Sequence, residues 1–245
     1  MANNIPISIG VLFAMTQALK KSIKPGLTSR QIKDVLYEQV ARIGKAASSP
    51  KRLELLELLC QGEMNVEQLA LKAQISIKLT SAHLSVLKSA SLVIYRREGK
   101  NIFYSLAASG VARFWVDIRS LAEERLLELQ EALGNFVSSS GSLESMDRAA
   151  LLREAESGEI VVIDVRPEGE YIAGHLPFAR SIPVAELKKR IAEIPKNKTV
   201  VAYCRGPFCL LAGEAVSILQ KAGHHAVRLD DGVAEWQARG LAIQR

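Results

Sequence analysis

The stretch TVVAYCRGPFCLLAGEAVSILQKAGH (residues 199–224) passes from a β-rich apolar run, through a short loop, into a helical pattern. The run TVVAYC predicts a buried strand, and the apolar spacing after the loop predicts a helix that ends near Gly223. Cys204 therefore falls at the carboxyl end of a strand, which is where α/β sheets place their binding and catalytic groups. This stretch favours an α/β fold with its chemistry at Cys204.

The loop after Cys204 has the composition of a turn that stabilises negative charge. Its backbone N–H groups are expected to converge on one point, and the dipole of the following helix adds positive potential. Arg205 adds a full positive charge. All three effects lower the pKa of a thiol, so we expect Cys204 to be a thiolate near neutral pH. The residues expected to hold a substrate against Cys204 are Arg205, Gly206, Pro207, Phe208 and Cys209.

Cys209, at the far end of the same loop, has two candidate roles. In one, it is a resolving thiol that closes a disulfide or a sulfur-bridged link with Cys204. In the other, it is an apolar residue in the first turn of the helix. Phosphate chemistry is disfavoured, because tyrosine phosphatases and related arsenate reductases need an arginine six residues after the cysteine, where this chain has Leu210.

Other short apolar runs between helical stretches continue the α/β pattern, among them EIVVIDVR (residues 159–166). Strands that alternate with helices predict a parallel sheet. Asp164 and Arg166 end this strand near the loop, where we favour a structural ion pair over a direct part in the chemistry. We also favour structural roles for His175 and Trp236.

Three ordered motifs of this half resemble the rhodanese family of sulfurtransferases over roughly residues 145–243. They are VVIDVRPEGEYIAGHLPFARSIPV, YCRGPFC and LDDGVAEWQARG. The resemblance implies that Cys204 attacks the sulfane sulfur of thiosulfate, a polysulfide or a persulfide. The protein would then carry a Cys204 persulfide and pass the outer sulfur to a thiol or to cyanide.

Ser and Gly interrupt the helical periodicity in GNFVSSSGSLES (residues 134–145), which is a linker composition. We place the linker at residues 135–145, between a first domain at residues 1–134 and a second at residues 146–245. Residues 1–135 carry 18 Lys and Arg against 12 Asp and Glu, whereas residues 136–245 carry 14 of each. A positive excess confined to the first half favours a polyanion partner there.

Within the first half, LTSRQIKDVLYEQVARIGKAAS (residues 27–48) predicts one helix, and residues 65–93 predict two more joined by a brief turn. The N-caps of these two are expected at Asn65 and Ser76. One stripe of the second helix is apolar and expected to be buried, and it consists of Thr80, Leu84 and Leu87. The opposite face is small, polar or basic and suits entry into a DNA major groove. The residues of this face are Ser76, Ile77, Lys78, Ser81, Ala82 and Ser85.

The next stretch, LVIYRREGKNIFYSL (residues 92–106), predicts a protruding hairpin. Its strands are expected at residues 92–97 and 100–106, and they meet at a turn of Glu98 and Gly99. Basic residues crowd the tip, where they suit contact with phosphate or with the minor groove. They are Arg96, Arg97 and Lys100.

Over roughly residues 35–130 these segments resemble, in register, the arsenic-repressor (ArsR) family of winged-helix regulators. The matching stretches are SPKRLELLELLCQGEMNVEQLA, SAHLSVLKSASLV and RREGKNIFYSL. The resemblance implies a recognition helix at residues 76–88 that reads a double-stranded DNA operator, and a wing at residues 96–100. It also implies a symmetric homodimer formed by the first and last helices of the domain, the last being expected at residues 114–133.

Several residues depart from that family's pattern. Its metal sensors carry Cys-x-Cys before the turn or histidines in the last helix, and this chain has neither, so we expect no metal and no cofactor. Cys60 lies on an apolar helix without a second thiol in this half, so we expect it to be buried and inert. Ser91 stands where the family usually has glycine, at a cost of roughly 1 kcal/mol if the position is left-handed.

Three cysteines, the absence of a membrane-length apolar run and the absence of a signal-peptide pattern favour a cytoplasmic protein with no membrane partner. The predicted fold class is two domains: a mainly α winged helix-turn-helix, then an α/β rhodanese-like domain with a parallel sheet. Together they predict a DNA-binding regulator that senses or transfers sulfane sulfur through a Cys204 persulfide. The alternatives are a sulfurtransferase whose helical half serves for dimerisation or localisation, and a constitutive DNA-binding protein with an inactive second half.

Overall fold

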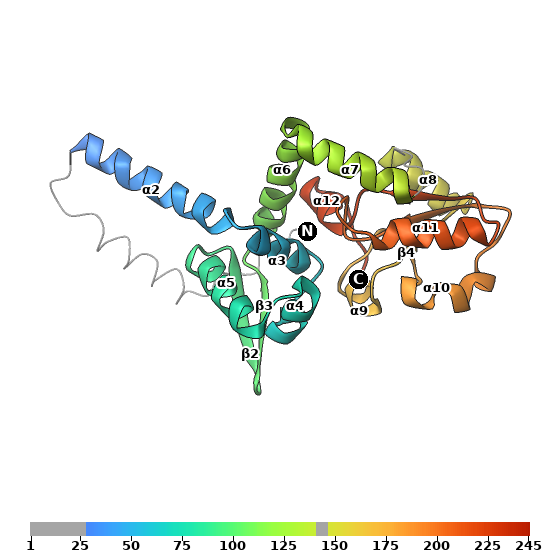
Figure 1. The fold of residues 1–245 in the computed structure, drawn as a ribbon, viewed down its shortest axis with the longest axis horizontal. Helices are drawn as coiled ribbons and strands as arrows, with labels where there is room; N and C mark the ends of the chain where they lie inside the picture. The colour runs from blue at the N-terminus through green and yellow to red at the C-terminus, as the bar shows by residue number, and fades with distance from the viewer. Residues whose placement is uncertain (1–27, 141–146) are drawn as a thin grey trace. The chain divides into compact units, whose positions relative to one another are not determined.

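A computed structural model describes residues 28–140 and 147–245 of the chain (Figure 1). The N-terminal extension and the part of the expected linker at residues 141–145 lie outside the described residues. In the two described ranges, no helix combines the length and apolar character needed to cross a membrane. Contacts between residues group the chain into two compact units, Met1–Ala47 and Ser48–Arg245.

The described part of the first unit is helix α2 (Ser29–Ala47), which confirms the predicted first helix. Its apolar residues repeat at helical spacing and form an exposed stripe, in which Ile32 is 44%, Leu36 61% and Val40 69% exposed. A continuous exposed apolar stripe is typical of a surface that binds another chain.

The second unit begins with a winged helix. The side chain of Asn65 accepts a hydrogen bond from the N–H of Gln68, and the side chain of Ser76 accepts one from the N–H of Leu79. Both predicted N-caps are therefore confirmed, and the predicted apolar stripe of α5 is buried. The elements are α3 (Pro50–Cys60), β1 (Met64–Asn65), α4 (Val66–Ala73), α5 (Ile77–Ser89), β2 (Val93–Glu98), β3 (Asn101–Leu106), α6 (Ser109–Arg125) and α7 (Leu127–Ser140).

The wing is the antiparallel hairpin of β2 and β3, and β1 adds a short third strand along β3. Glu98 pairs with Asn101, so the turn consists of Gly99 and Lys100. The prediction of a Glu98-Gly99 turn is wrong by one residue. Gly99 has a φ of +59°, and this left-handed conformation belongs at the first turn position, where only glycine adopts it without cost.

The last helix of the winged half is broken. The prediction of one helix over residues 114–133 is wrong, because Leu126 adopts an extended conformation between α6 and α7. The break leaves carbonyl groups without their helical partners. The side-chain amide of Gln130 donates to two of them, the carbonyls of Glu123 and Glu124.

The second of these helices also corrects the expected linker. Helix α7 continues to Ser140, so residues 135–140 are helical rather than irregular. A glycine inside a helix costs only about 1 kcal/mol, and contact between α7 and α11 can offset that cost. The domain boundaries themselves stay a prediction.

The rest of the second unit is an α/β fold around a four-stranded sheet, which confirms the predicted parallel sheet. The strand order is β5-β4-β6-β7, and every neighbouring pair is parallel. Asp164 is in register with Tyr203, so β4 and β6 end side by side. The elements are α8 (Arg148–Ser157), β4 (Ile160–Asp164), α9 (Glu168–Ala173), β5 (Arg180–Ser181), α10 (Val184–Arg190), the 3₁₀ helix η1 (Ile191–Glu193), β6 (Thr199–Tyr203), α11 (Leu211–Lys221), β7 (Ala226–Leu229) and α12 (Val233–Ala238).

Alternating side chains of the strands fill two apolar cores, one on each face of the sheet. On one face they pack with α10 and α11, for example against Val216. On the other they pack with α8 and α12, for example against Trp236, which is fully buried as expected. His175 has the expected structural role, because its ring stacks on Tyr171 and its Nδ1 lies 2.9 Å from the carbonyl oxygen of Tyr171.

The winged helix and the α/β fold pack against each other inside this unit. Helix α6 lies along α12 (Figure 1), and α3 contacts α12 as well. Cys60, Trp115 and Val116 from the winged half form an apolar cluster with Ala234 of α12. Burial raises the pKa of the Cys60 thiol far above its ordinary value, which confirms the expectation of a buried, unreactive cysteine.

Candidate functional site

Cys204 directly follows β6, at the carboxyl edge of the sheet, and is only 1% exposed. It packs in the apolar cluster that also contains Cys209 and Ala212. The backbone N–H groups of Gly206 and Ala212 donate toward its sulfur. The sulfur also lies 3.5 Å from the carbonyl oxygen of Cys209. The predicted place at the strand end is confirmed, and amide donors reach the sulfur as expected.

The two loop cysteines are both buried and form a coupled pair whose pKa values shift in opposite directions. Burial first, then the hydrogen bond to Cys209 and its charge, raise the pKa of Cys204 well above its ordinary value. The hydrogen bond from Cys204, with amide donors from Arg205 and Leu211, lowers the pKa of Cys209 to about 6. Cys204 lies deeper than Cys209, and the two sulfurs titrate as one pair. The expectation that Cys204 is itself the thiolate stays a prediction.

One hydrogen bond, one close approach and one unusual backbone angle restrict the sulfur loop, which we define as residues 204–209. The carbonyl oxygen of Pro207 accepts a hydrogen bond from Nη2 of Arg228 at 2.6 Å. A Cβ atom at Gly232 would lie 2.6 Å from the carbonyl oxygen of Cys204. Gly206 has a φ of +138°, which residues with side chains rarely adopt. The loop is thus held in one conformation by neighbours that leave space for backbone alone.

Arg205 is bound to a buried carboxylate. Its Nη2 lies 2.7 Å from Oε1 of Glu170, which also accepts from Nζ of Lys72 on α4 at 2.8 Å. Burial raises the pKa of Glu170, but the hydrogen bonds from Arg205 and Lys72 outweigh it and hold that pKa below its ordinary value. Neither Glu170 nor Lys72 is among the site residues predicted from the sequence. Glu170 stands within a quoted motif, whereas no local pattern marks Lys72, whose partner is 98 residues away.

Asp164 and Arg166 form the ion pair that the sequence favoured, with Nη2 of Arg166 2.5 Å from Oδ2 of Asp164. Both side chains are fully buried. The hydroxyl of Tyr203 donates to Oδ2 of Asp164 at 2.6 Å, which ties the ends of β4 and β6 together. Nη1 of Arg166 donates to Oε1 of Gln61, the C-cap residue of α3, at 2.8 Å. The pair therefore also joins the edge of the sheet to the winged helix.

A second buried ion pair lies against the sulfur loop. Arg119 of α6 places Nη1 2.6 Å from Oε1 of Glu235 on α12, and the two side chains are 4% and 2% exposed. Oε2 of Glu235 accepts from the N–H of Gly232 at 2.6 Å. A Cβ atom at Gly206 would lie 3.2 Å from Nη1 of Arg119 and from Oε1 of Glu235. The ion pair is thus in close contact with the backbone of the loop.

An aromatic contact lies beside this ion pair. The rings of Phe208 and Trp115 meet edge to face, with their centroids 6.4 Å apart. The guanidinium of Arg119 lies 5.8 Å from the centroid of the Phe208 ring. Two neighbouring turns of α6 therefore contact the outer side of the loop.

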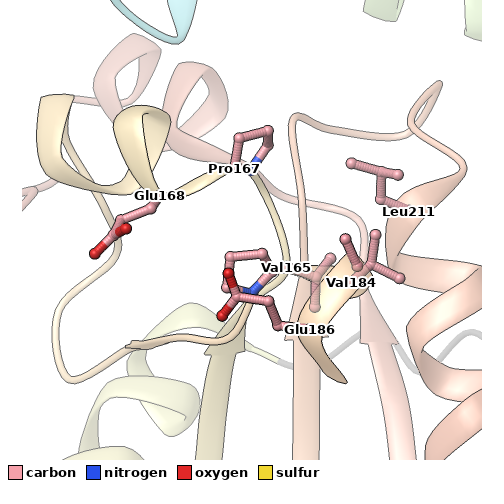
Figure 2. Close-up of a pocket in the computed structure, with 8 residues that line it drawn as sticks. Val165, Pro167, Glu168, Val184, Glu186 and Leu211 are labelled. Atoms are coloured by element: carbon pink, nitrogen blue, oxygen red, sulfur yellow. The ribbon is translucent and has the colours of Figure 1, made fainter. Parts of the chain in front are cut away.

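A pocket of about 330 Å³ lies at the same edge of the sheet (Figure 2). Most of its lining is apolar, and Glu168 and Glu186 contribute carboxylates. Val165, Val184 and Leu211 line it and also pack in or against the cluster that contains both loop sulfurs. The pocket and the cluster that contains the sulfurs therefore share these three side chains.

The side chains predicted to contact DNA are all exposed, both on α5 and on the wing. Arg96 forms ion pairs with Glu63, at 2.5 Å, and with Glu98. Its guanidinium also lies 4.6 Å from the centroid of the Phe103 ring. These partners fix Arg96 along the wing, beside Arg97 and Lys100. The DNA-contact residues are Ser76, Ile77, Lys78, Ser81, Ala82, Ser85, Arg96, Arg97 and Lys100, and their role stays a prediction.

Comparison with known families matches the two halves separately. The model of bacterial regulatory proteins of the arsR family matches residues 49–95, and the model of the rhodanese-like domain matches residues 147–239. The HTH-type transcriptional regulator Rv0324 of Mycobacterium tuberculosis is 43% identical over 211 residues, which is 86% of this chain and 92% of that protein. A sulfurtransferase of Allochromatium vinosum is 32% identical over 92 residues, 37% of this chain and 84% of that protein.

Among solved structures, one similar chain is the homodimeric winged helix-turn-helix DNA-binding domain (fragment 1–100) Mb0332 of Mycobacterium bovis. It is 40% identical, and the match covers 43% of this chain and 95% of that one with a TM-score of 0.39.

Proposed function

This chain belongs to the arsR family of bacterial regulatory proteins and carries a rhodanese-like domain after its helix-turn-helix, and we propose that it is a transcriptional regulator whose operator affinity responds to sulfane sulfur bound at Cys204. The observation that carries the proposal is the position of two buried cysteines in one loop at the carboxyl end of β6, with the Cys204 sulfur 3.5 Å from the carbonyl oxygen of Cys209. Such a site can hold one negative charge on sulfur at neutral pH and keep it when a sulfur atom is added.

In the proposed reaction Cys204 is the nucleophile and Cys209 its base. The thiolate of Cys209 takes the proton of Cys204 as the Cys204 sulfur attacks the outer sulfur of the donor. With thiosulfate, the new S–S bond forms as the bond to sulfite breaks. A thiolate and a thiosulfate dianion thus give the Cys204 persulfide anion, a neutral Cys209 thiol and a sulfite dianion, so charge and protons balance.

The resolving role of Cys209 is the second course open to the same intermediate. When the persulfide is protonated, the Cys209 thiolate attacks the Cys204 sulfur and expels hydrosulfide, which leaves a Cys204–Cys209 disulfide. Mass spectrometry distinguishes the products, because the persulfide adds one sulfur to the chain whereas the disulfide removes two hydrogens.

On the DNA side, the exposed small and polar face of α5 is proposed to enter the major groove, with Arg97 and Lys100 of the wing on phosphates. A homodimer would present two such helices to a symmetric operator. Two observations support the dimer: the exposed apolar stripe of α2, and the similarity to a domain described as homodimeric.

A gel-shift assay tests the proposal with duplex DNA from upstream of the protein's own gene, with and without polysulfide. We expect polysulfide to change the affinity of the wild type at least fivefold and to leave the affinity of Cys204→Ser unchanged. An equal affinity for both proteins under both conditions contradicts sensing. That result, with binding intact, would leave a constitutive DNA-binding protein.

The charge on the cysteine pair can be measured directly. The ultraviolet absorbance of thiolate should rise with pH around a midpoint near 6, the value to which hydrogen bonds lower the pKa of Cys209. Cys204→Ala removes the hydrogen-bond donor and should move the midpoint upward. Cys204→Ser keeps a hydroxyl donor and serves as the matched control with a smaller shift.

The alternative is a sulfurtransferase whose helical half serves for dimerisation or localisation. The apolar pocket near the sulfur loop favours it, because it offers space for a donor or acceptor beside the reactive edge. Turnover of thiosulfate and cyanide tests this alternative. Sustained turnover combined with an operator affinity that ignores polysulfide would favour the enzyme over the regulator.

A further inference from the structure

We propose that the face of α6 that carries Trp115 and Arg119 reads the chemical state of the sulfur loop, and that this buried contact couples the sulfur site to the DNA-binding helices. The inference rests on the proposed chemistry at Cys204 and names the regulation of that site.

Little free space surrounds the sulfur of Cys204. Cys204 is 1% exposed within a packed core, so an added sulfur atom must displace a neighbour. The inner side of the loop is held by Gly232, where a Cβ atom would lie only 2.6 Å from the Cys204 carbonyl oxygen, and by Arg228 on Pro207. The Arg228 side chain is only 3% exposed, so both contacts lie within the packed α/β fold and resist displacement.

The outer side of the loop is the face that can respond. There Gly206 lies against the Arg119–Glu235 ion pair, and Phe208 lies against Trp115. These contacts are made by side chains on α6 and α12, whose packing can change without breaking the sheet. A shift of the loop by a fraction of an ångström would therefore be passed to α6.

Helix α6 is placed to pass the shift onward. Trp115 packs with Cys60 of α3 and with Leu106 at the end of β3. Helix α3 in turn contacts both α4 and the recognition helix α5. A second ion pair, from Lys72 of α4 to Glu170 and so to Arg205, joins the loop to the same helices. The loop is thus connected to the winged helix at two independent points.

The test uses the full-length chain and a variant that loses the buried charges together. Arg119→Met combined with Glu235→Gln removes both charges of the buried pair, and glutamine can still accept from the N–H of Gly232. The other partner of Arg119 is Glu123, at 3.0 Å, which is 25% exposed and so keeps contact with water. Trp115→Leu is a second variant, aimed at the aromatic contact. Arg113→Met is the matched control, because Arg113 lies on the exposed side of α6.

Hydrogen–deuterium exchange of α6 is the direct readout, taken before and after polysulfide and, separately, iodoacetamide. Mass spectrometry confirms that the loop cysteines are modified. We expect wild type and Arg113→Met to change exchange in α6 with either reagent. The Arg119→Met/Glu235→Gln protein should form the Cys204 persulfide at a rate within about twofold of wild type. It should lose the change of exchange in α6, and polysulfide should change its operator affinity at least fivefold less than it changes that of wild type.

Each outcome separates the two proposals. If modification of the loop leaves exchange in wild-type α6 unchanged, the coupling is overturned. It is also overturned if the double variant and Trp115→Leu both keep the full operator response. If iodoacetamide changes α6 but polysulfide never changes operator affinity, the proposed function fails and the coupling stands.

Discussion

The exposed face of α5 and the buried sulfur loop are two functional surfaces built in opposite ways. The face of α5 belongs to one helix, and its predicted contact residues all point to solvent. The sulfur loop is enclosed by side chains from α4, α6, α9 and α12. A surface of the first kind can change residue by residue, whereas in the second each side chain depends on its neighbours.

The largest expected effect breaks the loop surface at the Arg119–Glu235 ion pair. Arg119→Met alone leaves Glu235 charged and buried at 2% exposure, so the free energy of unfolding should fall by about 3–5 kcal/mol. Urea unfolding measures the loss, and the added Glu235→Gln change should restore most of it. Arg113→Met, on the exposed side of the same helix, should change stability by less than about 0.5 kcal/mol. A loss in Arg119→Met as small as the control's would mean that the pair is solvated.

A second change sharpens the same comparison through glycine. A Cβ atom at Gly232 would lie 2.6 Å from the carbonyl oxygen of Cys204, so Gly232→Ala should lower the free energy of unfolding by about 1–3 kcal/mol. It should also slow formation of the Cys204 persulfide, because the loop must move. Gly110→Ala in α6 is the control, since a Cβ atom there meets nothing within 4 Å. Thermal unfolding of both proteins gives the difference, and equal midpoints would contradict the close approach.

The sequence was most informative where structure is local. Helical spacing and two N-caps defined α4 and α5, and strand composition with breakers defined the parallel sheet. These patterns are informative because the secondary structure at each residue depends mainly on neighbours within one or two turns. The prediction that Cys204 ends a strand succeeded for the same reason.

The errors arose where contacts are distant in sequence. Nothing near Arg119 indicates that its partner is Glu235, 116 residues away. A loop motif also does not reveal how burial and a second sulfur shift the pKa of Cys204, because both depend on packing around the loop. The break at Leu126 has no glycine or proline to announce it, and α7 after the break contacts α11, which is distant in sequence.

Ser91, which follows α5, tests whether one substitution beside this helix changes the free energy of unfolding without changes elsewhere. Ser91 has a φ of +59°, as the expectation of a left-handed position after α5 requires. Ser91→Gly should raise the free energy of unfolding by about 1 kcal/mol, less the entropy that glycine gains in the unfolded chain. Ser85→Gly, the same substitution within α5, should instead lower it by about 0.5 kcal/mol. Thermal unfolding measures both, and two changes of the same sign would contradict a backbone effect.

The smallest effect concerns the wing, where side chains act one at a time. If Lys100 of each subunit contacts a phosphate, Lys100→Gln should weaken DNA binding roughly fourfold per subunit at physiological salt and lower the salt slope by about 0.9 per subunit, so twice that for a homodimer. Arg97→Gln should do the same, and the two losses should add because the side chains share no partner in the proposed contact. Arg125→Gln, at the end of α6, is the matched loss of charge away from the wing. Fluorescence anisotropy at several salt concentrations gives the slopes. Equal slopes for Lys100→Gln, Arg125→Gln and wild type would remove the wing from the interface and leave α5 as the contact surface.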